Sequence, residues 1–326
     1  MILLQKDPCR DFTVLNLTDP QLDASYLGQT SPDWQLLSKT IDSVIQKASP
    51  DLITISGDLG YGDDPTYPAT CKQFADFIEK HKIPWAVVWG NHDNQGGSDV
   101  IKKTVQLFQQ YPHFVYESGD EQLGNGNYLI RIQENNSTIA GIIMMDTHNR
   151  FPYTDTSGNT IAAWGKLLPN QLEWYQEQIQ TLQNLNCMHS LLITHIPIYT
   201  YRQAFDAAFR AGIDPKSISL KDSYSKFCWR PEYESSFGVR YEKECCYPAD
   251  EGAFKLIQSL NNTKVILCGH DHVNCWCVNY HGIKLTYSLK TGQGCYHHKD
   301  LNGGTIVKIH SDGTMDVEHI FADVCG

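Results

Sequence analysis

The stretch Leu52-Ile-Thr-Ile-Ser-Gly-Asp58 places a short apolar run directly before a glycine and a carboxylate. A second apolar run, Trp85–Val88, leads into Gly90-Asn91-His92-Asp93. Runs of this length bounded by glycine are typical of buried strands, and the glycine permits a sharp exit from each strand. Ligands gather at the carboxyl ends of strands in an open α/β sheet, so both stretches predict a site at that edge.

Apolar strands and amphipathic helices alternate around these two stretches. Phe12–Leu17 is predicted as a buried strand, and the helix after it begins at Pro32 behind a serine cap. Further helices are predicted near Cys71–Lys80 and from residue 98 to about residue 110. This alternating order predicts a parallel sheet with helices on its faces.

The second half of the chain continues in the same style within what we expect to be a single domain of residues 1–326. The strands predicted there are Tyr128–Gln133, Thr138–Met145, Leu191–Thr194 and Val265–Cys268. A helix is predicted to start at Pro169, and antiparallel strands are predicted from Asn274 onward. Residues 211–249 fit neither period and are predicted to form a cysteine-containing insertion, and loops of that length are usually functional.

The composition of the 326-residue chain excludes several classes of protein. It has 26 basic and 37 acidic residues, and a net charge of -11 argues against a general binder of nucleic acid or anionic membranes. Hydrophobic residues make up 41%, as in globular proteins, and no apolar run approaches the ~18 residues that span a bilayer. We expect a monomer or weak homodimer without a transmembrane segment or a nucleic-acid-binding surface.

The eleven cysteines and several N-glycosylation triplets favour an oxidising compartment. The triplets begin at Asn16, Asn135, Asn136 and Asn261, and Asn16 is expected to be unavailable within a strand. The N-terminus is too short for a signal peptide, so we expect a mature glycoprotein whose signal was removed and whose Met1 was added for expression. A secreted or lysosomal location is expected, and a reduced cytoplasmic protein is the alternative.

The cysteines also lead to a prediction about disulfides. Cys268 ends an apolar strand, where a bridge would distort the following loop, so we expect it to be buried and reduced. The other ten cysteines could then form five disulfides. Cys228 is the expected partner of Cys245 or Cys246, and such a bridge would hold the insertion as a rigid rim above the site.

Potential metal ligands recur after five of the predicted strands. They lie in Asp19-Pro20-Gln21, Gly57-Asp58, Gly90-Asn91-His92-Asp93, His195 and Gly269-His270-Asp271-His272. Each cluster alone has an ordinary explanation, such as a turn or a structural histidine. All five in this order are hard to obtain by chance, and converging Asp, Asn and His side chains suit divalent or trivalent cations.

These clusters resemble the pattern of the calcineurin-like metallophosphoesterases, D-x-[H/Q] … G-D … G-N-H-[D/E] … H … G-H-x-H. Tyr61, three residues after Asp58, resembles the G-D-x-x-Y motif of the purple acid phosphatase branch, and residues 269–274 are similar to small plant-type members of it. The resemblance covers residues 11–321 apart from the details of the insertion. It implies an α/β fold, a four-layer α/β/β/α sandwich with two mixed β-sheets.

The resemblance also implies a site with two metal ions, of Fe, Zn, Mn or Mg, bridged by Asp58. The remaining ligands would be Asp19, Gln21 and His272 for the first ion and Asn91, His195 and His270 for the second. Gln21 departs from the more frequent His, and its neutral amide would bind the first ion weakly. Tyr61 would be either a further ligand or part of the pocket lining.

The function implied by the resemblance is hydrolysis of a small-molecule, lipid or protein phosphoester by a metal-bridging hydroxide. His92 would donate a proton or contact a phosphate oxygen, with Asp93 orienting it. An acid-phosphatase-like phosphomonoesterase is favoured. The alternatives are a phosphodiesterase of acid sphingomyelinase-like type and a non-catalytic binding protein on the same fold.

Three residues outside the motif are candidate substrate contacts. His148 follows a predicted strand, Tyr199 lies just after His195, and His297 follows the glycine-rich segment 292–294. Each also has an ordinary explanation as a surface or packing residue.

Overall fold

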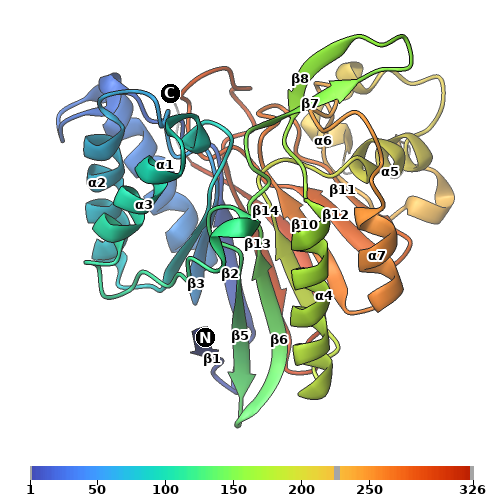
Figure 1. Cartoon of the computed structure of the whole chain (residues 1–326), viewed down its shortest axis with the longest axis horizontal. Helices are drawn as coiled ribbons and strands as arrows, with labels where there is room; N and C mark the ends of the chain where they lie inside the picture. The colour runs from blue at the N-terminus through green and yellow to red at the C-terminus, as the bar shows by residue number, and fades with distance from the viewer. Residues whose placement is uncertain (1, 224–227, 324–326) are drawn as a thin grey trace.

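Two mixed β-sheets form the centre of the molecule in the computed structural model, which describes residues 2–223 and 228–323 (Figure 1). The five-stranded sheet has the order β14 (Met315–Phe321), β13 (Gly303–Ile309), β2 (Phe12–Leu17), β3 (Leu52–Ser56) and β4 (Trp85–Val88). The seven-stranded sheet has the order β1 (Ile2–Gln5), β5 (Tyr128–Glu134), β6 (Ser137–Met144), β9 (Ser190–Ile193), β10 (Thr263–Cys268), β12 (Ile283–Tyr287) and β11 (Cys277–Tyr280). A separate hairpin consists of β7 (Arg150–Thr154) and β8 (Thr160–Trp164).

The helices cover the outer faces of the two sheets. They are α1 (Pro32–Ala48), α2 (Tyr67–Ile78), α3 (Ser98–Phe108), α4 (Pro169–Asn184), α5 (Thr200–Ala208), α6 (Leu220–Ser223) and α7 (Ala253–Leu260). Figure 1 shows α1, α2 and α3 together on one side, and α4, α5 and α7 on the other. No helix among the described residues is both long enough and apolar enough to cross a bilayer.

The buried apolar residues form three main clusters that follow this layering. One joins the five-stranded sheet to α1, α2 and α3. Its members include Ile53 of the sheet, Ile41 of α1 and Phe74 of α2. A second lies between the two sheets and includes Val14 and Ile142. The third joins the seven-stranded sheet to α4, α5 and α7. Two mixed sheets within an α/β fold were predicted, and this is confirmed.

The parallel strands β2, β3 and β4 bring their carboxyl ends to one edge. Leu15 pairs with Ile53, and Ile55 pairs with Val87, in parallel register. In the other sheet β9 and β10 are also parallel to each other. The bounds of β2, β3 and β4 agree with the predicted strands, because each is an apolar run that is buried on both faces.

The insertion at 211–249 contributes to the main core. Trp229 is buried, and its ring packs against Phe205 and Phe209 of the α5 segment at centroid distances of 5.8 and 5.5 Å. Phe209 and Trp229 also form an isolated β-bridge. Burial of this large indole therefore fastens the insertion to the seven-stranded sheet and its helices.

The predicted disulfide framework is wrong. Free thiols are found at Cys9, Cys71, Cys187, Cys245, Cys246, Cys268, Cys275, Cys277 and Cys295. Neither Cys245 nor Cys246 is therefore bridged to Cys228, and Cys325 lies outside the described residues. Cys268 is fully buried and reduced as predicted, and burial holds its thiol pKa well above the ordinary value. Apolar packing therefore fixes the insertion, and the free thiols give no support to an oxidising compartment.

Candidate metal centre

Five loops meet at the carboxyl edge of the two sheets, and three of them hold candidate ligands in an unusual backbone conformation. Asp19, Gln21, Asp58 and His270 have φ values of 53°, 55°, 53° and 75°. Side chains other than glycine rarely occupy this left-handed region, and such residues concentrate at functional sites. Each residue follows a strand end, so the strained turns aim polar side chains at one point.

Glycines allow the loops to approach closely. A Cβ atom at Gly90 would lie 2.1 Å from Asp58 Oδ1, and one at Gly269 would lie 2.5 Å from Asp19 Oδ2. Both contacts are far shorter than van der Waals distance. The glycines predicted to permit sharp exits thus also make room for the carboxylates.

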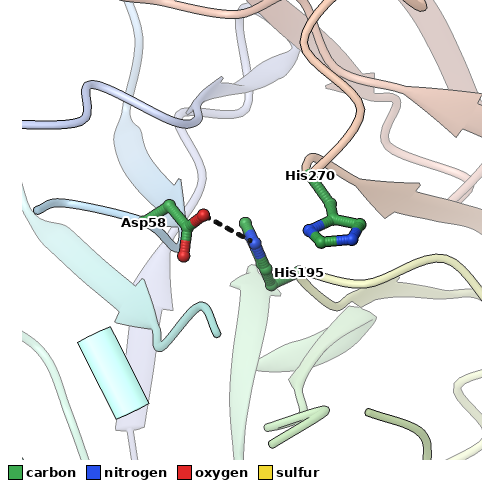
Figure 2. Close-up of side chains that lie close together, drawn as sticks. All are labelled: Asp58, His195 and His270. Carbon is green, nitrogen blue, oxygen red and sulfur yellow. Dashed lines mark ion pairs between the residues drawn. The ribbon is translucent and has the colours of Figure 1, made fainter. Parts of the chain in front are cut away.

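The side chains form two groups of potential metal ligands that share one carboxylate. Asp58, His195 and His270 make one group, and Asp19, Asp58 and His272 make the other. The ligand atoms within each group lie within 4.8 Å of one another, and all these residues are buried. Figure 2 shows the first group, with Asp58 and His270 on opposite sides of His195.

The carboxylate of Asp58 is contacted from several loops. Its Oδ1 accepts a 2.8 Å hydrogen bond from the backbone N–H of His92. Its Oδ2 accepts a 2.9 Å bond from Gln21 Nε2 and lies 3.3 Å from His195 Nε2. Asp58 is therefore the residue common to both groups, and its role as a bridging ligand stays a prediction.

Backbone carbonyls fix the orientation of two of the imidazoles. His195 Nδ1 donates to the carbonyl of Ser56 at 2.7 Å, and His272 Nδ1 donates to the carbonyl of Tyr296 at 2.9 Å. A carbonyl can only accept, so Nδ1 carries the proton and Nε2 of each ring is free to coordinate. Histidines that bind metals generally make this kind of outer hydrogen bond.

The free nitrogens face oxygen atoms that cannot supply a proton. His195 Nε2 lies 3.1 Å from Asn91 Oδ1, and His272 Nε2 lies 3.4 Å from Asp19 Oδ1. Asp19 Oδ1, Gln21 Oε1 and His270 Nε2 are buried and make no hydrogen bond within the part of the chain that the structure describes. Buried acceptors without donors are costly, so the donor set fits bound cations.

The pKa values of the three histidines also indicate that the two carboxylates attract positive charge. Burial opposes protonation of His195, but the carboxylates of Asp58 and Asp19 outweigh it and raise its pKa to about 10. At His272, burial and Lys290 are likewise outweighed by Asp19, which raises the pKa to about 9. Burial and the neighbouring His195 lower the pKa of His270 to about 3. Protons or metal ions must therefore balance the two carboxylates.

The predicted role of Asp93 in orienting His92 has no counterpart among the hydrogen bonds that its carboxylate makes. Both oxygens of Asp93 are engaged elsewhere, with Oδ2 accepting from the N–H groups of Asp58 and Gly90 at 2.8 Å and Oδ1 accepting from Tyr67 at 2.8 Å. Asp93 thus ties the loops after β3 and β4 together. The ring of His92 is contacted instead by Gln95, at 3.1 Å from Nδ1, within the short 3₁₀ segment η3 (Asp93–Gly96).

The other predicted residues are Tyr61, His148, Tyr199 and His297, and each has different neighbours in the structure. Tyr61 packs edge-on against the ring of His92, with centroids 4.8 Å apart. His148 is held by Gln171, which contacts its Nε2 at 3.0 Å. Tyr199 lines a separate small cavity of about 30 Å³, and His297 is exposed and bonds within its own loop.

Several contacting residues were missed by sequence reasoning. Gln95 lies three residues after His92, a spacing that could have been noticed. Lys290 is buried beside the centre and donates to the Asp19 carbonyl, and Trp164 presents its ring to His270 at a centroid distance of 4.4 Å. Neither belongs to a recognisable motif, because both reach the centre only through the tertiary fold.

The chain belongs to the calcineurin-like phosphoesterase family, whose model matches residues 12–274. Membership of this family of dimetal phosphoesterases implies two metal ions. A dimetal phosphatase from Danio rerio has the same fold, with a TM-score of 0.53 at 12% identity over 96% of this chain and 100% of that one.

Two curated relatives are similar in sequence. Phosphatase DCR2 of Saccharomyces cerevisiae is 25% identical over 73% of this chain, which spans 38% of that protein. Probable inactive purple acid phosphatase 14 of Arabidopsis thaliana is 27% identical over 79% of this chain, which spans 61% of that protein. The chain therefore corresponds to only part of the length of either relative.

Proposed function

We propose that the chain hydrolyses phosphomonoesters at a binuclear metal centre. The observation that carries this proposal is the pair of buried ligand groups that share Asp58. In this proposal Asp19, Gln21 and His272 hold one ion with Asp58, and the other ligands are Asn91, His195 and His270. Iron, zinc, manganese or magnesium would suit these mixed oxygen and nitrogen donors.

When bound, the two cations neutralise the phosphoryl group and activate a water for attack on phosphorus. The protein's own contribution is to hold the ligands rigidly. Asp93 ties the Asp58 loop to Gly90, and the carbonyls of Ser56 and Tyr296 fix the two imidazoles. Ligands set in this way need little reorganisation during the reaction.

His92 is the proposed proton donor to the leaving alkoxide. Its side chain is 27% exposed, and its Nε2 lies 4.0 Å from Asp58 Oδ2. Gln95 holds Nδ1, which leaves Nε2 as the ring atom nearest the carboxylate. A positioned imidazole of this kind contributes ~10²–10⁴-fold to proton transfer. Tyr61, against the His92 ring, is proposed to line the pocket.

The test compares rates on a nitrophenyl monoester and a bis-nitrophenyl diester, with the metal content measured on the same sample. A higher kcat/KM for the monoester and two equivalents of metal are expected. A higher value for the diester would favour a phosphodiesterase of acid sphingomyelinase-like type.

A non-catalytic binding protein is the second candidate, and one contact favours it. The amide of Gln21 donates from Nε2 to Asp58, so only its neutral oxygen is left to coordinate the first cation, and such an oxygen is a weak ligand. The name of the Arabidopsis relative also describes it as probably inactive. Less than one equivalent of metal after full metal supply, together with no turnover, would support this candidate.

A further inference from the structure

An open pocket of about 390 Å³ lies beside the proposed centre. The β7–β8 hairpin forms one wall, and residues 243–248 of the insertion and its flank form the other. The hairpin projects from the body of the molecule above this region (Figure 1). Its contribution to the wall includes Arg150, Ile161 and Trp164.

Two contacts connect the pocket to the centre. The ring of Trp164 meets His270 edge-on, with centroids 4.4 Å apart at 81°. On the facing wall, the N–H of Cys245 donates to Asp271 at 3.1 Å, between the two histidines of the same loop. The pocket and the proposed metal centre are therefore one indole ring apart.

The pocket is lined by cations although the chain carries a net charge of -11. Arg150, Arg202 and Lys243 all contribute to its walls. Within residues 2–223 and 228–323, no carboxylate forms an ion pair with any of these three cations. The Arg150 guanidinium lies 3.7 Å from the Trp164 ring centroid and donates to the Ala162 carbonyl at 3.0 Å.

The one carboxylate in the wall, Glu244, forms its ion pair with an arginine outside the pocket lining. Glu244 is buried and forms an ion pair with Arg240 at 3.6 Å. The Arg202 guanidinium donates from Nη2 to the backbone carbonyl of Glu244 at 2.6 Å. Glu244 interacts electrostatically with Arg202 as well as with Arg240, so the charge left without a carboxylate partner is that of Arg150 and Lys243, and this favours an anionic ligand.

We propose that this pocket binds a second anionic group, a phosphate or a carboxylate, on the leaving group of the phosphoester substrate. The inference rests on the proposed function and adds a substrate class to it. Arg150 and Lys243 supply the charge, because their side chains are exposed at the wall. The exposed Ile161 and the neighbouring Ala162 and Pro248 provide an apolar surface for a short aliphatic spacer.

The experiment compares three esters of equal spacer length: butyl phosphate, the same ester with a terminal phosphate, and the same ester with a terminal carboxylate. We expect the two esters with a terminal anion to have a kcat/KM about tenfold higher than butyl phosphate. The preference between phosphate and carboxylate identifies the group that the pocket recognises. Added salt should reduce the preference, because the interaction is between charges.

The double variant Arg150→Gln/Lys243→Gln should lose this preference. The matched control is Lys39→Gln/Lys103→Gln, which removes the same charge from exposed positions on α1 and α3 and should retain the preference. Equal kcat/KM values for the three esters in the wild-type protein would overturn the proposal. A preference that survives in the double variant would also overturn it.

Calorimetry with butane diphosphonate, which cannot be cleaved, tests the pocket separately from turnover. We expect it to bind about tenfold more weakly to the double variant than to the control. Equal binding to both would contradict the pocket even if every ester were hydrolysed. Absence of hydrolysis with all three esters would contradict the proposed function. In that case, weaker diphosphonate binding to the double variant than to the control would still support the pocket.

Discussion

Asp58 combines burial, an unusual backbone conformation and several polar contacts at the proposed centre. It is buried, its backbone is left-handed, and its carboxylate is contacted by Gln21, His92 and His195. Burial alone would raise the pKa of this carboxyl, but the positive charge of His195 lowers it below the ordinary value. The side chain is therefore held as an anion at the position shared by both ligand groups.

Asp58→Asn should abolish hydrolysis while the protein remains folded. An amide has nearly the same shape but cannot neutralise two cations. Circular dichroism and metal analysis should show a folded protein that has lost metal. Asp63→Asn, at an exposed position five residues away, makes the same chemical change and should retain full activity. Wild-type turnover in Asp58→Asn would exclude the bridging role.

His92→Ala should keep both metals and lose turnover by ~10²–10⁴-fold, because its proposed role is proton transfer. The loss should be largest with an alkyl phosphate and smallest with nitrophenyl phosphate, whose leaving group needs no proton. Steady-state rates on both substrates measure this difference. Near-full activity of the variant on the alkyl ester would rule out the acid role.

Gln21→His should tighten the binding of the first metal, because an imidazole is a better ligand than a neutral amide for borderline cations. Titration of the metal-free protein with zinc, followed by calorimetry, gives the affinity of each site. Only the weaker of the two affinities should change. An unchanged or lower affinity would count against Gln21 as a ligand.

At the scale of elements, continuous apolar runs made the inner strands predictable. β2, β3 and β4 have the predicted bounds, and the β5–β6 hairpin turns at Asn135 and Asn136, whose φ values are 50° and 66°. The β7–β8 hairpin was not predicted, because most of it is exposed and only one residue of its two strands is fully buried. Its position follows from contacts made after folding, such as that of Trp164 with His270.

The convergence of the candidate ligands was easier to predict than the contacts that hold them in place. Asp19, Asp58 and His270 each follow a strand, so their convergence could be inferred from strand order alone. The partner of Asp93 could not, because Tyr67 lies on a helix and reaches it from 26 positions away. Disulfides were mispredicted because the number of cysteines does not show which thiols are buried apart from one another.

The antiparallel pair β13–β14 contains a buried histidine that should make stability depend on pH. Burial lowers the pKa of His319 to about 4, while an exposed histidine titrates near 6.5. Between these values the unfolded chain binds a proton that the folded chain does not, so stability falls as pH drops from about 6.5 to 4. The loss from this residue is about 3 kcal/mol.

Urea unfolding at several pH values measures this effect. His319→Gln should flatten the fall in unfolding free energy between pH 6.5 and pH 4. His297→Gln changes an exposed histidine and should leave the slope as in the wild type. Equal slopes in the wild type and His319→Gln would contradict the assignment.

For the whole molecule, the free thiols predict a distinctive pattern of alkylation. Nine cysteines outside position 228 should react in denaturant without any reductant. In the native protein the exposed Cys9 and Cys295 should react before the other seven of these nine, which are at least partly buried. Intact mass after alkylation counts them. Fewer than three reactive thiols in denaturant would restore a disulfide framework.

The arrangement of β13 beside β2 also constrains the order of events during synthesis on the ribosome. Asp19 and Asp58 are made early, but β2 remains an open sheet edge until residues 303–309 arrive to pair with it. His270 and His272 also arrive late. Two enclosed carboxylates without imidazoles or cations would be strongly unfavourable, so the nascent chain cannot bury them early. The centre must therefore close after most of the polypeptide has emerged, and the incomplete chain leaves the loops of Asp19 and Asp58 in water until then.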